Sequence, residues 1–272
     1  MSGAASPLEH TRRRLERHTP IERFSRWLIL FVTVAAIVVS IRHVEVIPEF
    51  LYDAPSQMLD LLHRLWPPDL SYYREGVHDA LIETLHIASL GTLLALILAV
   101  PVALFSARNI TANPILNLLA KLVLVSSRSV NSLVWALLFV AVFGPGTLAG
   151  VLAIAFRSVG FVGKLLGEAL EEAHPGTIEA LVATGAPPAS VLLKGYWPQV
   201  KPALWSIALF RWDINVRESA VLGLVGAGGI GVALDQALDT FYWDKVSTVL
   251  LSIFAVVIAA ELIVTQIRKR II

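Results

Sequence analysis

The chain has no cysteine among its 272 residues, so disulfides, thiolate metal sites and thiol nucleophiles are excluded. Its seven histidines are scattered without the H-x-x-x-H spacing of a metal site, and we predict no bound metal. Charged residues make up only 16% of the chain, and the net charge of +1 gives no indication of nucleic-acid binding. These deficits argue against thiol, metal and nucleic-acid functions.

Apolar residues are what the chain has in excess. They make up 56% of it, with a mean hydropathy of +0.70, whereas soluble domains contain roughly 45–50%. Six long apolar runs with few charges stand out, at about residues 24–41, 77–107, 118–143, 148–166, 202–224 and 246–267. Each is long enough to cross a hydrocarbon core of about 30 Å as a helix. We therefore predict an all-α, polytopic membrane protein with about six transmembrane helices.

The distribution of Lys and Arg predicts the orientation, because cytoplasmic flanks carry the excess of these residues. If both termini are cytoplasmic, the segments on the outer side hold only Arg42, Arg64, Arg74 and Lys245, and the larger number lies inside. We therefore expect a multi-pass protein of the cell (inner) membrane with both termini in the cytoplasm.

Two parts of the chain differ in composition. Residues 1–76 hold a basic N-terminus, the first span and an external segment, in which QMLDLLHRLW at 57–66 is an amphipathic pattern typical of a membrane interface. Residues 77–272 hold the other five spans as one transmembrane domain, with a cytoplasmic segment at about 168–198 that forms two short helices. Glu168, Glu171 and Glu172, at the start of that segment, are interpreted as a solvated face.

The stretch LVGAGGIGVALD at 224–235 contains the letters G-x-G-x-x-G, which raises the possibility of a dinucleotide-binding enzyme. That fingerprint requires a buried strand before the glycines and a parallel sheet around them. Here a membrane span precedes them, so we expect Gly226, Gly228, Gly229 and Gly231 to serve either as an external gate or in tight turning and close packing.

The cytoplasmic segment carries a family resemblance. Glu179, Ala180, Gly185 and Pro198 follow the pattern E-A-x-x-x-x-G with a later proline. This resembles the ATPase-coupling loop of permease subunits in binding-protein-dependent ABC importers. Two short helices joined by a glycine turn form a rigid knob that can fit a groove on a partner. The sequence departs from the family in having Leu181 at the second alanine position and Gly-Tyr-Trp before the proline.

The region from residue 211, RWDINVRESAVLGLVGAGGIG, is similar to the phosphonate and phosphate-type branch of these permeases. The resemblance implies the type I ABC importer permease fold, and as partners a second copy of the chain, two ATP-binding cassette ATPase subunits, an external solute-binding protein and the lipid membrane. It implies a transport subunit that is not an enzyme and has no cofactor of its own, because ATP and Mg belong to the ATPase. Transport would proceed by alternating access.

The resemblance implies phosphonate- or phosphate-like oxyanions as the substrate, without separating phosphonate, phosphate and phosphite. An importer for another small solute, such as an amino acid or thiamin, is the alternative, and a secondary transporter is a further one. A secondary transporter would have no use for the coupling loop.

Charged residues within the predicted spans are candidates for the substrate path, because each costs about 2.5–3.5 kcal/mol at the centre of a membrane helix unless it meets water or a partner. Guanidinium groups suit phosphate-type oxygens. The alternative role is in salt bridges that fix helix packing. The charged candidates are Arg128, Arg157, Arg211, Asp213, Arg217 and Glu218, and Asn131, near Arg128, is a polar candidate. The three arginines at 128, 157 and 211 are expected to converge near the middle of the membrane.

Overall fold

The structure, a computed structural model, describes residues 20–43 and 48–271. No β-strand occurs within these residues, which confirms the all-α class. The chain divides into two units, Met1–Leu61 and Leu62–Ile272. Residues 62–76, which the sequence groups with the N-terminal part, belong to the second unit. There, the Asp69 amide donates to the carbonyl of Asp244 at 3.2 Å, and the Thr248 hydroxyl donates to the carbonyl of Asp69 at 2.8 Å.

The first unit contains helix α2 (Pro20–His43) and most of helix α3 (Pro48–Leu65). α2 is apolar and long enough to span a membrane, and it exposes its large side chains, such as Trp27 and Phe31. α3 includes the predicted amphipathic segment, with Leu59 and Leu62 alternating with Asp60 and other polar residues. The helical state of both predicted segments is therefore confirmed, while the interfacial position of α3 stays a prediction.

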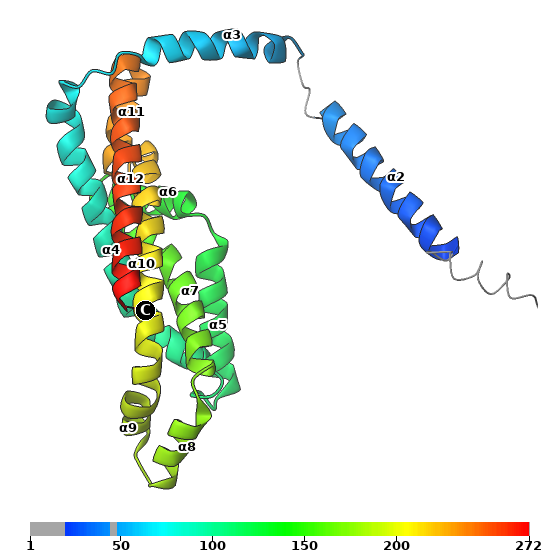
Figure 1. Ribbon diagram of the computed structural model, residues 1–272, viewed down its shortest axis with the longest axis vertical. Helices are drawn as coiled ribbons and strands as arrows, with labels where there is room; N and C mark the ends of the chain where they lie inside the picture. Colours follow the sequence, from blue (N-terminus) through cyan, green and yellow to red (C-terminus); the bar gives the residue numbers. More distant parts are fainter. Residues whose placement is uncertain (1–19, 44–47, 272) are drawn as a thin grey trace, which may run out of the picture. The chain divides into compact units, whose positions relative to one another are not determined.

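The second unit is a helical bundle (Figure 1). Its elements, in chain order, are η1 (Tyr73–Val77), α4 (His78–Ser106), α5 (Pro114–Ser129), α6 (Ser132–Phe143), α7 (Thr147–Glu171), α8 (Pro175–Ala183), α9 (Pro188–Ser190), η2 (Val191–Tyr196), α10 (Trp197–Leu222), η3 (Gly223–Val225), α11 (Ile230–Asp239) and α12 (Trp243–Ile271). α7 is central, because it packs against α4, α5, α6 and α10. α8 and α11 lie at opposite ends of this unit (Figure 1). We refer to the end formed by residues 175–187 as the α8 end.

Within the described residues, four helices are long and apolar enough to cross a membrane, or up to six spans exist if each bent helix pair counts as one. The predicted third span is such a pair, since α5 and α6 meet at an angle of 92°. The chain turns there because Val130 is extended and Asn131 starts a new helix, its side-chain oxygen accepting a hydrogen bond from the Leu133 amide at 3.1 Å. A single straight helix over 118–143 is therefore wrong.

Small residues allow α7 to approach its neighbours closely. A Cβ added at Gly160 would lie 2.5 Å from the carbonyl oxygen of Leu124 on α5, and one added at Gly167 would lie 2.6 Å from the hydroxyl of Ser106 on α4. Alanines dominate the buried face of α4. Backbones that pack this closely are typical of helix association in membranes, and they fix the positions of the polar side chains on α7.

Candidate functional site

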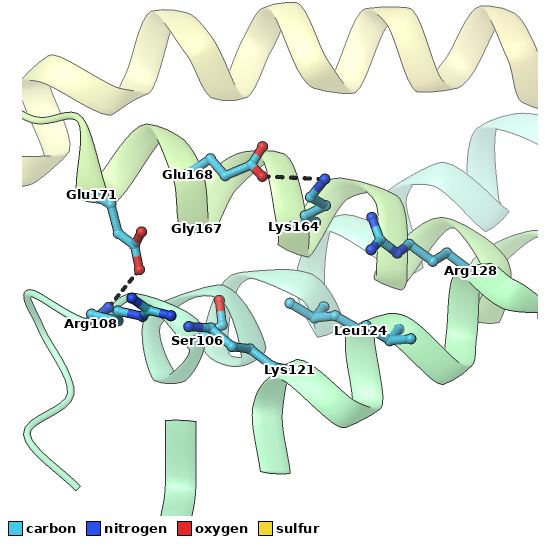
Figure 2. Close-up of a pocket in the computed structure, with 10 residues that line it drawn as sticks. Ser106, Arg108, Lys121, Leu124, Arg128, Lys164, Gly167, Glu168 and Glu171 are labelled. Carbon is cyan, nitrogen blue, oxygen red and sulfur yellow. Dashed lines mark hydrogen bonds and ion pairs between the residues drawn. The ribbon is translucent and has the colours of Figure 1, made fainter. Parts of the chain in front are cut away.

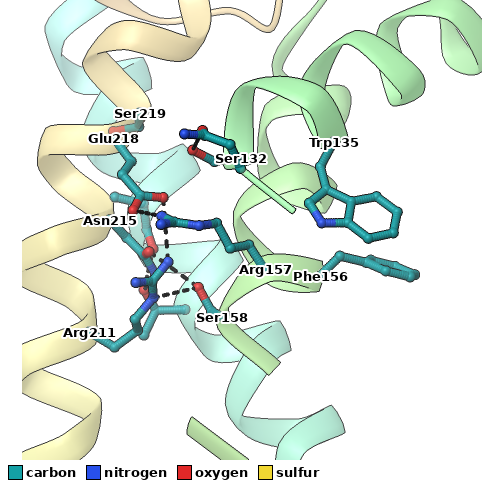
Figure 3. A network of polar contacts seen from close by, with 12 residues as sticks. Ser132, Trp135, Phe156, Arg157, Ser158, Arg211, Asn215, Glu218 and Ser219 are labelled. Atoms are coloured by element: carbon teal, nitrogen blue, oxygen red, sulfur yellow. Dashed lines mark hydrogen bonds and ion pairs between the residues drawn. The ribbon is translucent and has the colours of Figure 1, made fainter. Parts of the chain in front are cut away.

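Three charged side chains meet between α7 and α10, and we call them the midspan network: Arg157, Arg211 and Glu218 (Figure 3). Glu218 pairs with Arg157 through one carboxylate oxygen and lies 3.4 Å from Arg211 through the other. The Arg211 side chain is only 4% exposed, so this charge depends on protein partners. One carboxylate therefore serves two guanidinium groups, which leaves an excess of one positive charge in the middle of the bundle.

Neutral polar side chains hold Arg211 in place. Its Nε donates to the Ser158 hydroxyl at 2.8 Å, and that hydroxyl lies 3.2 Å from the amide oxygen of Asn215. The Asn215 amide nitrogen donates in turn to the hydroxyl of Thr92 at 2.8 Å. Ser158, Asn215 and Thr92 come from α7, α10 and α4, and all three are buried. This chain of hydrogen bonds fixes the guanidinium relative to three helices and leaves it no freedom to turn to water.

A second ion pair lies on the same stretch of α10. Asp213 and Arg217 form an ion pair four residues apart, as their spacing predicts. The carboxylate is largely buried, while the Arg217 side chain is 50% exposed. The other oxygen of Asp213 has no hydrogen-bond partner within the described residues. Since the pair is neutral, it adds no net charge to the midspan network.

The remaining two candidates are placed elsewhere. The side chain of Asn131 caps α6 and also accepts a hydrogen bond from the Ser132 hydroxyl at 3.3 Å, so it has a structural role. Arg128 takes part in neither ion pair, and its side chain lines a different cavity, beside Lys164 (Figure 2). Of the three arginines expected to converge, Arg157 and Arg211 share a carboxylate, and Arg128 lies outside this network.

The segment that resembles the coupling loop forms a helical corner at the α8 end. α8 ends in a Schellman motif, in which the Gly185 amide donates to the carbonyl of Val182 at 2.9 Å and the Ala186 amide donates to that of Leu181 at 3.2 Å. Gly185 has a φ of +74°, a left-handed conformation that glycine adopts without strain. Glu179 and Ala180 are exposed on α8, so the corner presents an accessible surface.

The second short helix is continuous with the next span. Helical structure runs from α9 through η2 into α10 without a break, and Pro198 lies in the first turn of α10. Proline has no amide hydrogen to donate, and here it lies directly after the wider π-helical turn η2, within the continuous helix. Pro198, which precedes the predicted span at 202–224, thus lies inside the helix that forms this span. The second arm of the corner therefore belongs to the same helical stretch that carries Arg211 and Glu218.

The glycine-rich stretch follows α10 and forms the turn into α11. Gly226, with a φ of +79°, ends the helix in a second Schellman motif, in which the Ala227 amide donates to the carbonyl of Leu222 at 3.2 Å. Gly228 and Gly229 also have positive φ, and a Cβ on Gly231 would lie 2.5 Å from the carbonyl oxygen of Ala220. A helix precedes the fingerprint where a dinucleotide site needs a strand. These contacts give the glycines a role in turning and packing, and the external gate stays a prediction.

A family model described as "Binding-protein-dependent transport system inner membrane component" matches residues 99–272. The chain belongs to this family. The match covers the bent α5–α6 pair, the midspan network, the corner at Gly185 and the glycine-rich turn. The chain is therefore a membrane-embedded permease component of an ABC importer.

Several curated permeases are similar to this one over most of its length. The phosphite transport system permease protein PtxC of Stutzerimonas stutzeri is 40% identical over 203 residues, which cover 75% of this chain and 74% of the relative. The phosphate-import permease protein PhnE of Mycolicibacterium smegmatis is 38% identical over 235 residues, which cover 86% of this chain and 44% of the relative. These findings confirm the resemblance to the phosphonate and phosphate-type branch.

A solved structure shares the fold. The inward-facing MetNI methionine ABC transporter contains a chain that superimposes with a TM-score of 0.62 at 22% sequence identity, over 72% of this chain and 96% of that one. The likeness supports the type I importer fold of the second unit. It carries no information on the substrate of this permease.

Sequence reasoning missed Ser158, Asn215 and Thr92, although the sequence contains a signal for one of them. Asn215 lies between Arg211 and Glu218 at helical spacing, so that the three form one polar stripe on α10. Ser158 follows Arg157 directly and, like it, contacts α10, and Thr92 lies in an otherwise apolar run. Their hydrogen bonds depend on how α4, α7 and α10 pack, which no local pattern contains.

Proposed function

We propose that this permease moves phosphate-type oxyanions, the class that contains phosphate, phosphite and phosphonates, into the cytoplasm. The observation that carries the proposal is the midspan network, where two guanidinium groups from different helices share one carboxylate. An arginine fork matches the oxygens of a phosphate-type anion as well as those of a carboxylate. The names of the similar permeases, which refer to phosphite and phosphate, support the same substrate class.

The network also suggests how the anion passes. Glu218 pairs with both arginines in this structure, and an incoming oxyanion replaces its carboxylate as their counter-ion. Arg157, whose side chain is 28% exposed, is the more accessible of the two arginines and meets the anion first. Arg211 is held by Ser158 and keeps its direction during the exchange. Because Glu218 links α7 to α10, the exchange loosens one contact between the two helices and is coupled to their relative motion.

The assembly is part of the proposal. We infer that two copies of the chain form the path, that two ATPase subunits dock on the corner around Glu179 and Gly185, and that a solute-binding protein delivers the anion at the opposite end. ATP and Mg are then bound by the ATPase subunits, and this chain contributes no catalytic group. In this orientation the α8 end and both termini face the cytoplasm. The corner is exposed and α9 is continuous with α10, and both observations support transmission of the ATPase movement to the membrane helices.

The test is uptake by the complete complex in proteoliposomes. Arg157→Gln and Arg211→Gln are expected to lower uptake of radiolabelled phosphate or phosphite at least tenfold, while the complex still assembles. Arg157→Lys should retain more uptake than Arg157→Gln, because it keeps the charge and loses the fork. Lys269→Gln, near the end of α12, is a control for loss of one positive charge. Normal uptake in both glutamine variants would contradict an oxyanion path through the network.

A further inference from the structure

A second group of cations surrounds a cavity of about 410 Å³ between α5 and α7, towards the α8 end (Figure 2). We call it the inner cavity and define it by the charged residues that line it: Arg108, Lys121, Arg128, Lys164, Glu168 and Glu171. Lys121 and Arg128 are seven residues apart on one face of α5, and Lys164, Glu168 and Glu171 follow helical spacing on α7. The two helices therefore face the cavity with charged stripes.

The charges of the inner cavity do not balance. The ammonium group of Lys164 lies 3.3 Å from Glu168, and a carboxylate oxygen of Glu171 accepts a hydrogen bond from the backbone amide of Arg108 at 2.8 Å. Within the described part of the chain, no carboxylate pairs with the side chains of Arg108, Lys121 or Arg128. Four cations and two carboxylates leave an excess of two positive charges, which is the charge that a dianion would neutralise.

The cations of α5 cannot face lipid. A bare Lys or Arg within the hydrocarbon region costs about 2.5–3.5 kcal/mol, whereas exposed Leu119, Leu122 and Val123, on other sides of α5, suit lipid. The apolar face therefore turns outward and the basic face turns toward an aqueous space. Gly167 of α7 and Ser106 of α4, which pack closely against each other, also line this space.

The cavity continues the polar face of the midspan network. On α7, Arg157, Lys164 and Glu171 are spaced by seven residues, so they lie along one side of the helix, about 10 Å apart at 1.5 Å per residue. Lys164 is thus about two turns nearer to the α8 end than Arg157, and the Arg128 side chain reaches the same cavity from α5. An anion that leaves the network toward that end meets these cations next.

We propose that the inner cavity is a second binding site for phosphate-type oxyanions, which accepts the anion on its way out and is filled from the α8 side when the anion accumulates there. This rests on the proposed function for the direction of transport. Occupation of the site blocks the exit, so the accumulated product slows turnover. The same chemistry would hold the head group of an anionic phospholipid, which is the other source of such an anion.

The first experiment measures inhibition. The permease–ATPase complex in nanodiscs of phosphatidylcholine is stimulated with saturating, ligand-loaded binding protein, and its ATPase rate is titrated with orthophosphate and, separately, sulfate. The double variant Lys121→Gln/Arg128→Gln should raise the half-inhibitory concentration about tenfold or more, as expected for two charge-assisted contacts. Glu168→Gln should lower it several-fold, because this variant frees Lys164 and removes a repelling carboxylate.

The control variant removes the same charge at a place outside the inner cavity. Lys269→Gln/Arg270→Gln removes the same net charge from the end of α12 and should titrate like the wild type. The proposal is overturned if both cavity variants titrate like that control. Lys121→Gln and Arg128→Gln alter side chains that make no ion pair, and co-elution of the permease with its ATPase in size-exclusion chromatography reports whether each variant complex is assembled.

A binding measurement separates this proposal from the proposed function. Orthophosphate is added to the same complexes without binding protein, and line broadening of its ³¹P signal reports binding that requires no transport. Broadening that is reduced in Lys121→Gln/Arg128→Gln supports the inner cavity even if the uptake test on Arg157 fails. Equal broadening in both proteins overturns the cavity site, and the uptake test then still decides the function.

A lipid arm identifies the source of the anion. Cardiolipin is added to the nanodiscs, and the orthophosphate titration is repeated. If it raises the half-inhibitory concentration in the wild type and not in the double variant, the head group occupies the same cavity. If it changes neither protein, free oxyanion is the occupant. Both results support an oxyanion site and differ only in the source.

Discussion

Replacing Glu218 by Gln removes the carboxylate that Arg157 and Arg211 share. The perturbation is nearly isosteric, so its effect reports the loss of charge and not of volume. Arg211, at 4% exposure, cannot recover hydration, and removing one partner of a buried pair costs about 3–5 kcal/mol. Arg157 is 28% exposed and keeps some contact with water, which moves the expected cost to about 3 kcal/mol.

The assay is thermal unfolding of the purified permease–ATPase complex in one detergent. Glu218→Gln should lower the melting temperature clearly, and adding Arg211→Gln to it should raise the melting temperature again, because the second change removes the unpaired cation. Glu168→Gln is the matched comparison, since Lys164 and Glu168 are 45% and 48% exposed and such pairs contribute only about 0–1 kcal/mol. If Glu218→Gln and Glu168→Gln melt at the same temperature, the network does not stabilise the bundle and the reasoning is refuted.

Two other predictions concern glycines. Gly185→Val should abolish stimulation of the ATPase by loaded binding protein, because a β-branched residue at a φ of +74° is strained by about 1–3 kcal/mol. Gly185→Asn should retain this stimulation, since asparagine tolerates the conformation and nothing lies within 4 Å of the added Cβ. Equal coupling in both variants would contradict the role of the turn. Gly231→Ala should lower the melting temperature through overpacking by about 1–3 kcal/mol, because its Cβ would lie 2.7 Å from Cα of Gly223; unchanged melting would show that the α10–α11 junction is loosely packed.

Much of the fold follows from local sequence patterns, that is, from residues that are close together in the chain. The hydropathy of the runs at 77–107, 148–166 and 246–267 is enough to predict α4, α7 and α12, because a helix in lipid satisfies its own backbone hydrogen bonds. The pair Asp213–Arg217 follows in the same way from a spacing of four residues on one helix. The corner at Gly185 is equally local, since a helix end of this kind is defined by six consecutive residues.

Other features depend on packing between helices that are distant in sequence. Hydropathy cannot detect the 92° bend between α5 and α6, because both arms are apolar and the turn depends on the Asn131 cap and on the contacts of α6 with α7. The same limit applies to Pro198, because the sequence does not show that the chain is already helical through η2 before it reaches this proline.

The charged side chains show most clearly which features are local and which depend on tertiary packing. The sequence by itself determined that Arg128, Arg157 and Arg211 lie in apolar surroundings and require partners or water, because burying a charge is costly in any fold. Only the tertiary structure decided where each one lies. Arg157 and Arg211 lie beside Glu218 of α10, and Arg128 lines the inner cavity. The physical reason is that an ion pair between helices depends on their rotation and register, which close contacts such as that of Gly160 with Leu124 determine.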